Sequence, residues 1–232
     1  MNDAQRVETF TLIAGTGAPA GTKPTCPTGC ADNRVILVNQ AGQIVWQYGQ
    51  TGVSGAGFNQ LNNPNSAELL TNGNILIADE NNNRVIEVNQ YHQIKWRYGD
   101  PAITTILNGA AFANRLPNGH TLITDSNNNR IIELDIDKEV VFTYQTNARH
   151  GSMAMPLPTR AVRLRNGHTL ISDQFNHQVI EINEQSDIVF AQGKVGTIGV
   201  AFNLLNAPYD AKVIGDYRGL TPPASGQNAL AP

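Results

Sequence analysis

The sequence is poor in charge and in long apolar runs, and each shortage excludes a class of protein. Charged residues make up 15% of the 232-residue chain, against a share of about 25% in typical globular domains. The net charge of −3 provides no general attraction to nucleic acid, so we expect no nucleic-acid partner. No apolar run approaches the length of about 20 residues that crosses a bilayer, so we expect no membrane span.

The motifs of several enzyme classes are missing as well. The chain contains neither a Gly-x-Ser-x-Gly nucleophile elbow nor a His-Glu-x-x-His zinc motif. Its first residues, Met1–Arg6, lack the basic start and apolar core of a signal peptide. We expect no cofactor, and the sequence leaves open whether the protein is an enzyme.

Only two cysteines occur, Cys26 and Cys30, in the run Cys-Pro-Thr-Gly-Cys. Two thiols cannot complete a tetrahedral zinc site, and no histidine lies near them in the sequence. We expect a disulfide, with two free thiols as the alternative. An oxidised pair would indicate a secreted or periplasmic protein, and a reduced pair a cytoplasmic one.

A repeat dominates what is present. The pattern Asn-Gly-(Asn/His)-x-Leu-Ile-x-Asp occurs three times without gaps, at 72–79, 118–125 and 166–173. Each copy runs on into an (Arg/Gln)-(Val/Ile)-Ile-Glu unit, and a fourth copy of that unit stands at Arg34–Leu37. The units recur about every 48 residues, which is typical of the blades of a β-propeller.

The repeated pieces indicate strands. Asn-Gly before a β-branched run is a strong hairpin signal, because both residues tolerate positive φ. Four strand-like pieces occur in each repeat, and no segment shows a sustained helical period. We predict an all-β fold, a β-propeller of four blades with four antiparallel strands each. It forms a single domain over residues 1–232, with a Cys-containing loop insertion at about 17–32.

The first strand of each blade carries an aligned alanine: Ala67, Ala113, Ala161 and Ala211. Phe10–Ala14 matches a second strand, so the N-terminal blade needs a first strand from elsewhere. We therefore expect Tyr209–Ile214 to pair with Phe10–Ala14, so that the C-terminal strand closes the first blade. Five blades is the alternative, and it would need strands that we do not find after Ile214.

Residues 10 to about 214 resemble β-propeller repeats of the NHL type and the related blades of arylsulfotransferase-like proteins. The Asn-Gly-(Asn/His)-x-Leu-Ile-x-Asp and Asn-Arg-(Val/Ile)-Ile-Glu motifs, followed by a Trp or Phe with Tyr, carry the resemblance. NHL-type propellers include binding scaffolds, lyases and peptide-amidating enzymes, so the resemblance implies the fold and not one activity. None of the five histidines matches the catalytic histidine of arylsulfotransferases.

The residues that repeat in every blade are interpreted as structural. Asp79, like its equivalents in the next two blades, can accept hydrogen bonds from turn N–H groups. The run Asp79-x-Asn81-x-Asn83 also matches the start of a calcium loop, but Arg84 stands where such a loop needs glycine. We expect the repeated arginines to pair with the repeated glutamates, such as Glu87.

Function is sought where the blades differ. Long connections join each fourth strand to the next first strand, and long loops on a rigid scaffold commonly carry binding residues. Polar and aromatic variation around the aligned alanines marks the candidate ligand-binding residues. These are Glu68, Phe112, Arg115, Arg160, Arg163, Asp210 and Lys212, together with His150 from one long connection.

Arg160 and Asp210 occupy equivalent positions before the aligned alanine, and Phe112 stands at the same place in another blade. A cation, a carboxylate and an aromatic ring would form a clamp for a small polar molecule. We predict a propeller that binds a small polar ligand or a protein partner on its long-loop face. The alternatives are a lyase or hydrolase using His150 beside Arg160 and Asp210, a bare Arg–Asp ion pair, and a structural protein-binding scaffold.

Overall fold

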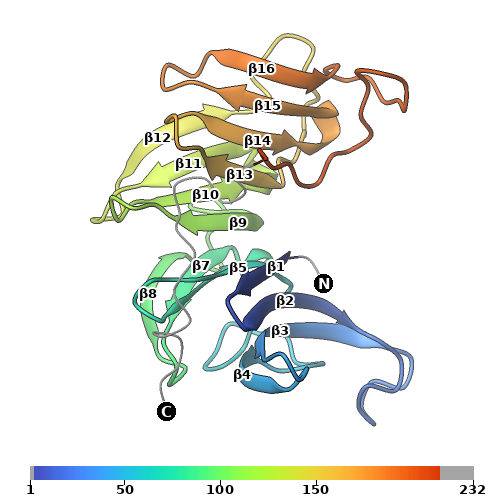
Figure 1. Ribbon diagram of the computed structural model, residues 1–232, viewed down its shortest axis with the longest axis vertical. Helices are drawn as coiled ribbons and strands as arrows, with labels where there is room; N and C mark the ends of the chain where they lie inside the picture. Colours follow the sequence, from blue (N-terminus) through green and yellow to red (C-terminus); the bar gives the residue numbers. More distant parts are fainter. Residues whose placement is uncertain (1–2, 215–232) are drawn as a thin grey trace. The chain divides into compact units, whose positions relative to one another are not determined.

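The structure is a computed structural model, described here for residues 3–214, in which four antiparallel sheets of four strands follow one another along the chain (Figure 1). Each sheet is a meander of consecutive strands. The first contains β1 (Asp3–Val7), β2 (Phe10–Ala18), β3 (Cys30–Val38) and β4 (Ile44–Gly49), and the second β5 (Pro64–Leu69), β6 (Ile75–Asp79), β7 (Arg84–Val88) and β8 (Ile94–Gly99). The third contains β9 (Ala110–Arg115), β10 (Thr121–Asp125), β11 (Arg130–Leu134) and β12 (Val140–Gln145), and the fourth β13 (Arg160–Arg163), β14 (Thr169–Asp173), β15 (Gln178–Ile182) and β16 (Ile188–Gly193).

Short 3-10 turns are the helical elements of the described residues, and they join the second and third strands of three sheets. They are η1 (Glu80–Asn82), η2 (Ser126–Asn128) and η3 (Gln174–Asn176). Within residues 3–214, no helix has the length and apolar character needed to cross a membrane.

The chain divides into two compact units. The first unit runs to Ala110 and holds the first two sheets, and the second begins at Ala111 and holds the third and fourth. In the first unit, β2 and β5 pack together around a core that includes Leu12, Tyr48 and Ile77. In the second unit, Leu122, Ile171 and Ile180 belong to the corresponding core. The all-β class and the four blades are therefore confirmed.

The prediction that the C-terminal strand closes the first blade is wrong. β1 fills that place, and its Ala4 pairs with Ile13 as Ala67 pairs with Ile77. Strand β2 already has β1 and β3 as neighbours, so it offers no free edge to Tyr209–Ile214. β1 escaped recognition because the turn that follows it is only two residues long and replaces the Asn-Gly signal with Glu8 at a φ of 49°.

Cys26 and Cys30 form the expected disulfide. The β2–β3 hairpin is longer than expected, because Gly17 pairs with Ala31 and Ala18 with Cys30. The Gly52 N–H, in the connection after β4, donates to the Ala31 carbonyl over 2.8 Å. The disulfide loop therefore lies on the side of the long connections, as its position in the blade predicts.

A buried ion pair anchors the long connection in the second blade. Arg84 Nε lies 2.7 Å from Asp79 Oδ2, and both side chains are almost inaccessible to water. The remaining guanidinium nitrogens donate to the carbonyls of Ala56 and Gln60 over 2.8 and 3.0 Å. Asp79 Oδ1 accepts the Asn62 N–H over 2.8 Å. The repeated aspartate thus holds the connection between two blades in place, which confirms its structural interpretation.

The expected pairing of this arginine with Glu87 is wrong. The two residues are three positions apart in one strand, so their side chains point to opposite faces of the sheet. Glu87 instead accepts a hydrogen bond from Asn74 Nδ2 over 2.7 Å. In the third blade Arg130 repeats the observed arrangement, with its Nε 2.6 Å from Asp125 Oδ2.

The first blade keeps the ion pair although its sequence lacks the aspartate. Gly15 pairs with Arg34 where Asp79 pairs with Arg84. The carboxylate comes instead from Asp32, whose Oδ1 lies 2.6 Å from Arg34 Nε. Asp32 Oδ2 is 2.6 Å from the point where a β-carbon on Gly15 would stand. Asp32 therefore fills the space of the missing side chain.

The fourth blade lacks the arginine instead, because Gln178 stands in its place. Arg149, from the connection after β12, supplies the guanidinium and pairs with the buried Asp173. Its other terminal nitrogen donates to Gln178 Oε1 over 2.9 Å. Burial raises the pKa of Asp173 to about 6, and Arg149 opposes that rise. All four blades thus bring a cation to a carboxylate at the same place in the fold.

A second repeated contact fixes where each connection enters the next first strand. In each blade, the residue before the repeated Arg or Gln has a positive φ, between 49° and 57°; it precedes β7, β11 and β15 and lies inside β3. Its side chain accepts the N–H of a connection residue over 2.9 to 3.2 Å. The acceptors are Asn33, Asn83, Asn129 and His177, and the donors are Asn63, Gly109, Leu157 and Ala207. The connection after β16 is therefore held like the other three.

A contact between β1 and β5 tests whether β1 is the first strand of the first blade. Gln5 Oε1 accepts the buried Leu69 N–H over 2.9 Å. Gln5→Ala leaves that donor without a partner, so the free energy of unfolding should fall by about 1–3 kcal/mol. Urea unfolding measures the change, and the exposed Gln50→Ala serves as the control. Equal unfolding midpoints for the two variants would contradict the role of β1.

The substituted ion pair of the fourth blade predicts a rescue. Arg149→Ala leaves the Asp173 carboxylate buried without its cation and should cost about 3–5 kcal/mol of stability. Adding Gln178→Arg returns an arginine to the position of Arg84 and Arg130, so the double variant should regain most of the loss. Chemical unfolding of the two single variants and the double variant measures the coupling. Additive effects would show that Arg149 acts in some other way.

The raised pKa of Asp173 predicts how stability depends on pH. Its pKa is 3.8 in the absence of burial and about 6 in the folded protein. The folded state holds the proton more tightly, so this contribution is present below about pH 4 and is lost as the pH rises through 6. The stability of the wild type minus that of Asp173→Asn should fall between pH 4 and 6. The exposed Asp187→Asn is the control, and a flat difference would refute the prediction.

Candidate functional site

Four of the predicted ligand-binding residues meet in the second unit, and we call them the Arg160 cluster. The Arg160 guanidinium carbon lies 4.0 Å from the centre of the Phe112 ring. Arg160 Nε is 3.1 Å from Asp210 Oδ1, and Lys212 Nζ is 3.0 Å from Asp210 Oδ2. The structure therefore brings together the cation, the carboxylate and the aromatic ring of the predicted clamp, and adds a second cation.

Local structure explains this meeting. Phe112 lies in β9, Arg160 begins β13, and Asp210 takes the equivalent place after the connection that His177 holds. Thr159 Oγ1 also donates to the Tyr209 carbonyl over 2.6 Å, which fixes the backbone next to Asp210. The side chains at this position are thus carried to one place by equivalent contacts.

The side chains of the Arg160 cluster differ in exposure, from the buried Phe112 to the partly exposed Lys212. Phe112 is buried, the Arg160 side chain is 15% exposed, and those of Asp210 and Lys212 are 35% and 42% exposed. Stacking on the ring orients the guanidinium, and cation–π attraction strengthens as water is excluded. Two cations share one carboxylate, so the cluster carries a net positive charge. An anionic group on a small molecule suits this arrangement.

The other predicted residues lie elsewhere. Arg115 and Arg163 end β9 and β13, at the opposite end of each strand from Phe112 and Arg160. Glu68 is buried in β5 of the first unit, and His150 is exposed in the connection after β12. The structure therefore does not place His150, Arg115 or Arg163 in the Arg160 cluster.

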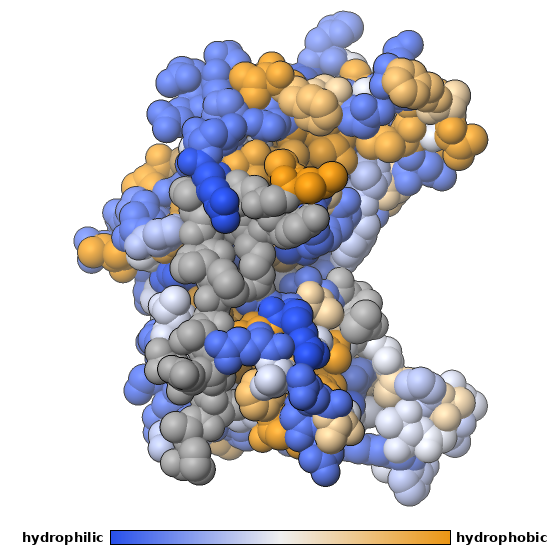
Figure 2. Space-filling view, in the orientation of Figure 1, coloured by the Kyte–Doolittle hydropathy of each residue, from blue (hydrophilic) through white to orange (hydrophobic). Residues whose placement is uncertain are grey.

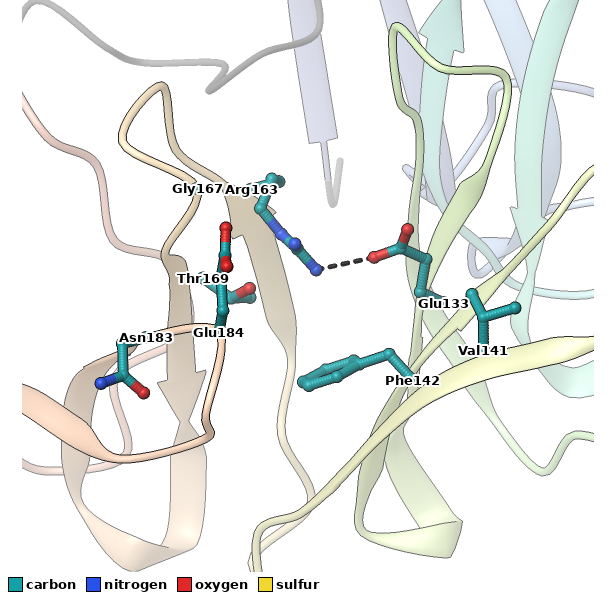
Figure 3. A pocket seen from close by; sticks show the side chains of 8 residues that line it. All are labelled: Glu133, Val141, Phe142, Arg163, Gly167, Thr169, Asn183 and Glu184. Carbon is teal, nitrogen blue, oxygen red and sulfur yellow. Dashed lines mark hydrogen bonds and ion pairs between the residues drawn. The ribbon is translucent and has the colours of Figure 1, made fainter.

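Sequence reasoning missed a cavity around Arg163. The cavity has a volume of about 230 Å³ and lies between the third and fourth sheets of the second unit (Figure 3). Arg163 reaches across it to Glu133, with Nη2 2.7 Å from Glu133 Oε2. Phe142 takes the repeated Trp or Phe position of its blade, so the sequence contains no separate signal for its place in the wall of the cavity.

No group of three or more His, Cys, Asp and Glu side chains within residues 3–214 is arranged to hold a metal ion. The calcium-like run beginning at Asp79 illustrates the reason. Asp79 Oδ2 accepts hydrogen bonds from Arg84 and Asn82, and Asp79 Oδ1 accepts one from the Asn62 N–H. The carboxylate is therefore occupied by protein donors.

Exposed apolar side chains gather in the connection after β16. Ile198, Val200 and Phe202 are 62%, 99% and 94% exposed. This segment is seen at the upper right of Figure 1, where Figure 2 shows hydrophobic surface. Nothing in the described residues covers it.

No protein-family model matches the chain, and no curated protein matches it. Solved structures do match. Virginiamycin B lyase from Staphylococcus aureus has a TM-score of 0.53 at 16% identity, and the match covers 84% of this chain and 55% of the lyase. A protein of unknown function from Bacteroides caccae has a TM-score of 0.55 at 15% identity, with coverage of 87% and 63%.

A third match has the same character. A putative exported protein from Bacteroides fragilis has a TM-score of 0.52 at 15% identity, and the match covers 80% of this chain and 48% of that protein. The chain thus spans about half to two thirds of the length of these structures. At such low identity the likeness establishes the fold alone. The four sheets are accordingly blades of the β-propeller type.

Proposed function

We propose that the protein binds a small polar ligand through an anionic group at the Arg160 cluster. The observation that carries the proposal is the position of the Arg160 guanidinium. It is stacked on Phe112 and forms an ion pair with the partly exposed carboxylate of Asp210. A guanidinium whose plane is fixed in advance loses little entropy when it binds a carboxylate or phosphate.

The Asp210 carboxylate takes the place that the anionic group of such a ligand would occupy. Its two oxygens lie beside Arg160 and Lys212, as the oxygens of a bound anion would. Within residues 3–214, Asp210 lies outside the strands of the four sheets. A ligand anion can therefore compete for the two cations, and the cost is the loss of partly exposed ion pairs, which are worth about 0–1 kcal/mol each.

A lyase or hydrolase reaction is the second candidate. The likeness to virginiamycin B lyase favours it, and so does the resemblance of the sequence to NHL-type propellers that include lyases. A reaction at this place would need a general acid or base within hydrogen-bond reach of the bound ligand. The Arg160 cluster would then bind the anionic part of the substrate.

Thermal unfolding with added anions tests the binding function. Citrate, succinate and inorganic phosphate are the probes, each compared with sodium chloride of equal ionic strength to remove screening effects. A ligand at about 100 times its Kd stabilises the folded state by about 2.7 kcal/mol, which raises Tm by several degrees. We expect at least one probe to do so.

Charge variants locate the effect. Arg160→Gln and Lys212→Gln should remove the stabilisation, and Asp210→Asn should strengthen it because the internal competitor is lost. Lys194→Gln, an exposed lysine in the connection after β16, should leave it unchanged. If no probe stabilises the wild type, or if Arg160→Gln responds as the wild type does, the cluster is only an ion pair.

A further inference from the structure

We propose that the cavity around Arg163 is a separate site for a small zwitterion, an α-amino acid with a free ammonium and a free carboxylate. We call it the Arg163 cavity. Its wall combines a cation, a carboxylate and an apolar surface on different sides. The lining residues are Glu133, Val141, Phe142, Arg163, Gly167, Thr169, Asn183 and Glu184.

Arg163 provides the carboxylate-binding side. One terminal nitrogen, Nη2, is engaged by Glu133. The buried Nε has no hydrogen-bond partner within the described residues, so the guanidinium makes fewer hydrogen bonds than its five donors allow. Since Arg163 lines the cavity with 17% of its side chain exposed, its remaining terminal donors can reach a ligand oxygen.

Glu133 orients Arg163 without competing for the ligand. Its Oε1 lies 2.7 Å from His120 Nδ1, and its Oε2 lies 2.7 Å from Arg163. Both oxygens therefore have partners, and the negative charge of Glu133 is balanced by the guanidinium. The Arg163 cation also lies 5.7 Å from the centre of the Phe142 ring. Figure 3 shows the Arg163–Glu133 contact that holds the guanidinium across the cavity.

Glu184 provides the ammonium-binding side. It lies in the turn between β15 and β16 and faces the β13–β14 turn, where its Oε1 is 3.0 Å from the point of a β-carbon on Gly167. Gly167 has a φ of 85°, so glycine both permits this turn and leaves room for the carboxylate. Among the described residues Glu184 has no hydrogen-bond or ion-pair partner. Figure 3 shows it on the wall opposite Phe142.

The third side suits an amino-acid side chain. Val141 is 53% exposed and Phe142 is partly buried, and both come from β12 on the far wall. The volume of about 230 Å³ is below the range of drug-sized pockets, about 300–1,000 Å³. It therefore suits a single amino acid of leucine size better than a longer peptide.

The charge balance distinguishes a zwitterion from simpler ligands. With Glu133 balanced by Arg163, Glu184 is the charge left over. A plain anion would bring its charge toward Glu184, and a plain cation would bring its charge toward Arg163. A molecule with both charges pairs with both groups, and charge-assisted hydrogen bonds are the strongest that such a site can make.

Titration of the ¹⁵N-labelled protein with L-leucine tests the proposal by NMR. At about 10 mM, a site with a Kd near 1 mM is about nine-tenths filled. We expect shifts at the amides of Gly167, Thr169 and Glu184. Leucinamide lacks the carboxylate and N-acetyl-leucine lacks the ammonium, so each should bind about tenfold more weakly.

Variants separate the two charged contacts. Glu184→Gln should weaken leucine binding about tenfold and leave N-acetyl-leucine unchanged, because that analogue has no ammonium to lose. Glu139→Gln, an exposed carboxylate in the third-blade turn, is the matched control and should bind leucine as the wild type does. Arg160→Gln should also leave leucine binding intact, since the Arg160 cluster lies at the other end of β13.

Three results would overturn the proposal. The first is the absence of shifts at these amides with leucine. The second is equal binding of leucine and both analogues, which would show that the charges play no part. The third is a response of the same amides to glucose and not to leucine, which would identify the cavity as a site for a neutral polyhydroxyl ligand.

Discussion

The pairing of a carboxylate with a guanidinium at the same place in all four blades is the interaction on which the rest of the structure depends. An uncompensated charge in that position would cost several kcal/mol. The pair in the second blade also ties down the preceding connection through the carbonyls of Ala56 and Gln60. The same contact that neutralises the buried charge therefore decides how one blade leads into the next. In the second blade, the position of β5, which follows this connection, depends on it.

The first and fourth blades show what the fold requires. It requires a pair of opposite charges at this place in each blade, and the charges can come from different sequence positions. Asp32 replaces a missing aspartate beside Gly15, and Arg149 replaces a missing arginine beside Gln178. Each substitute comes from a neighbouring segment that passes the same point. His177 extends this rule to a neutral contact, because its ring nitrogen accepts the N–H that an asparagine oxygen accepts elsewhere.

Much of the fold was predictable because hairpin turns and strand alternation are local. The four blades and the disulfide followed from residues close together in the chain. β1 was missed because its turn lacks Asn-Gly, although Ala4 stands where the aligned alanines stand. The meeting of Arg160, Asp210 and Phe112 was predictable, since equivalent positions in a repeat converge. The Arg163 cavity was not, because Glu184 and Phe142 come from different blades and occupy inequivalent positions.

These contacts explain which positions of the repeat are restricted and which can vary between blades. The carboxylate–guanidinium pairs use side chains where the second strand ends and the third begins. These positions are therefore restricted to residues that can form the ion pair. The side chain before each aligned alanine is carried to a defined place without taking part in these pairs. It is Ser66 in β5, Phe112 in β9, Arg160 in β13, and Asp210 in the segment after β16. Asp210 reaches Arg160 although it lies outside the described strands, because His177 and Thr159 hold the adjoining backbone. A frame that fixes the backbone and leaves this side chain free to vary is suited to building a binding site, as Phe112, Arg160 and Asp210 do in the second unit.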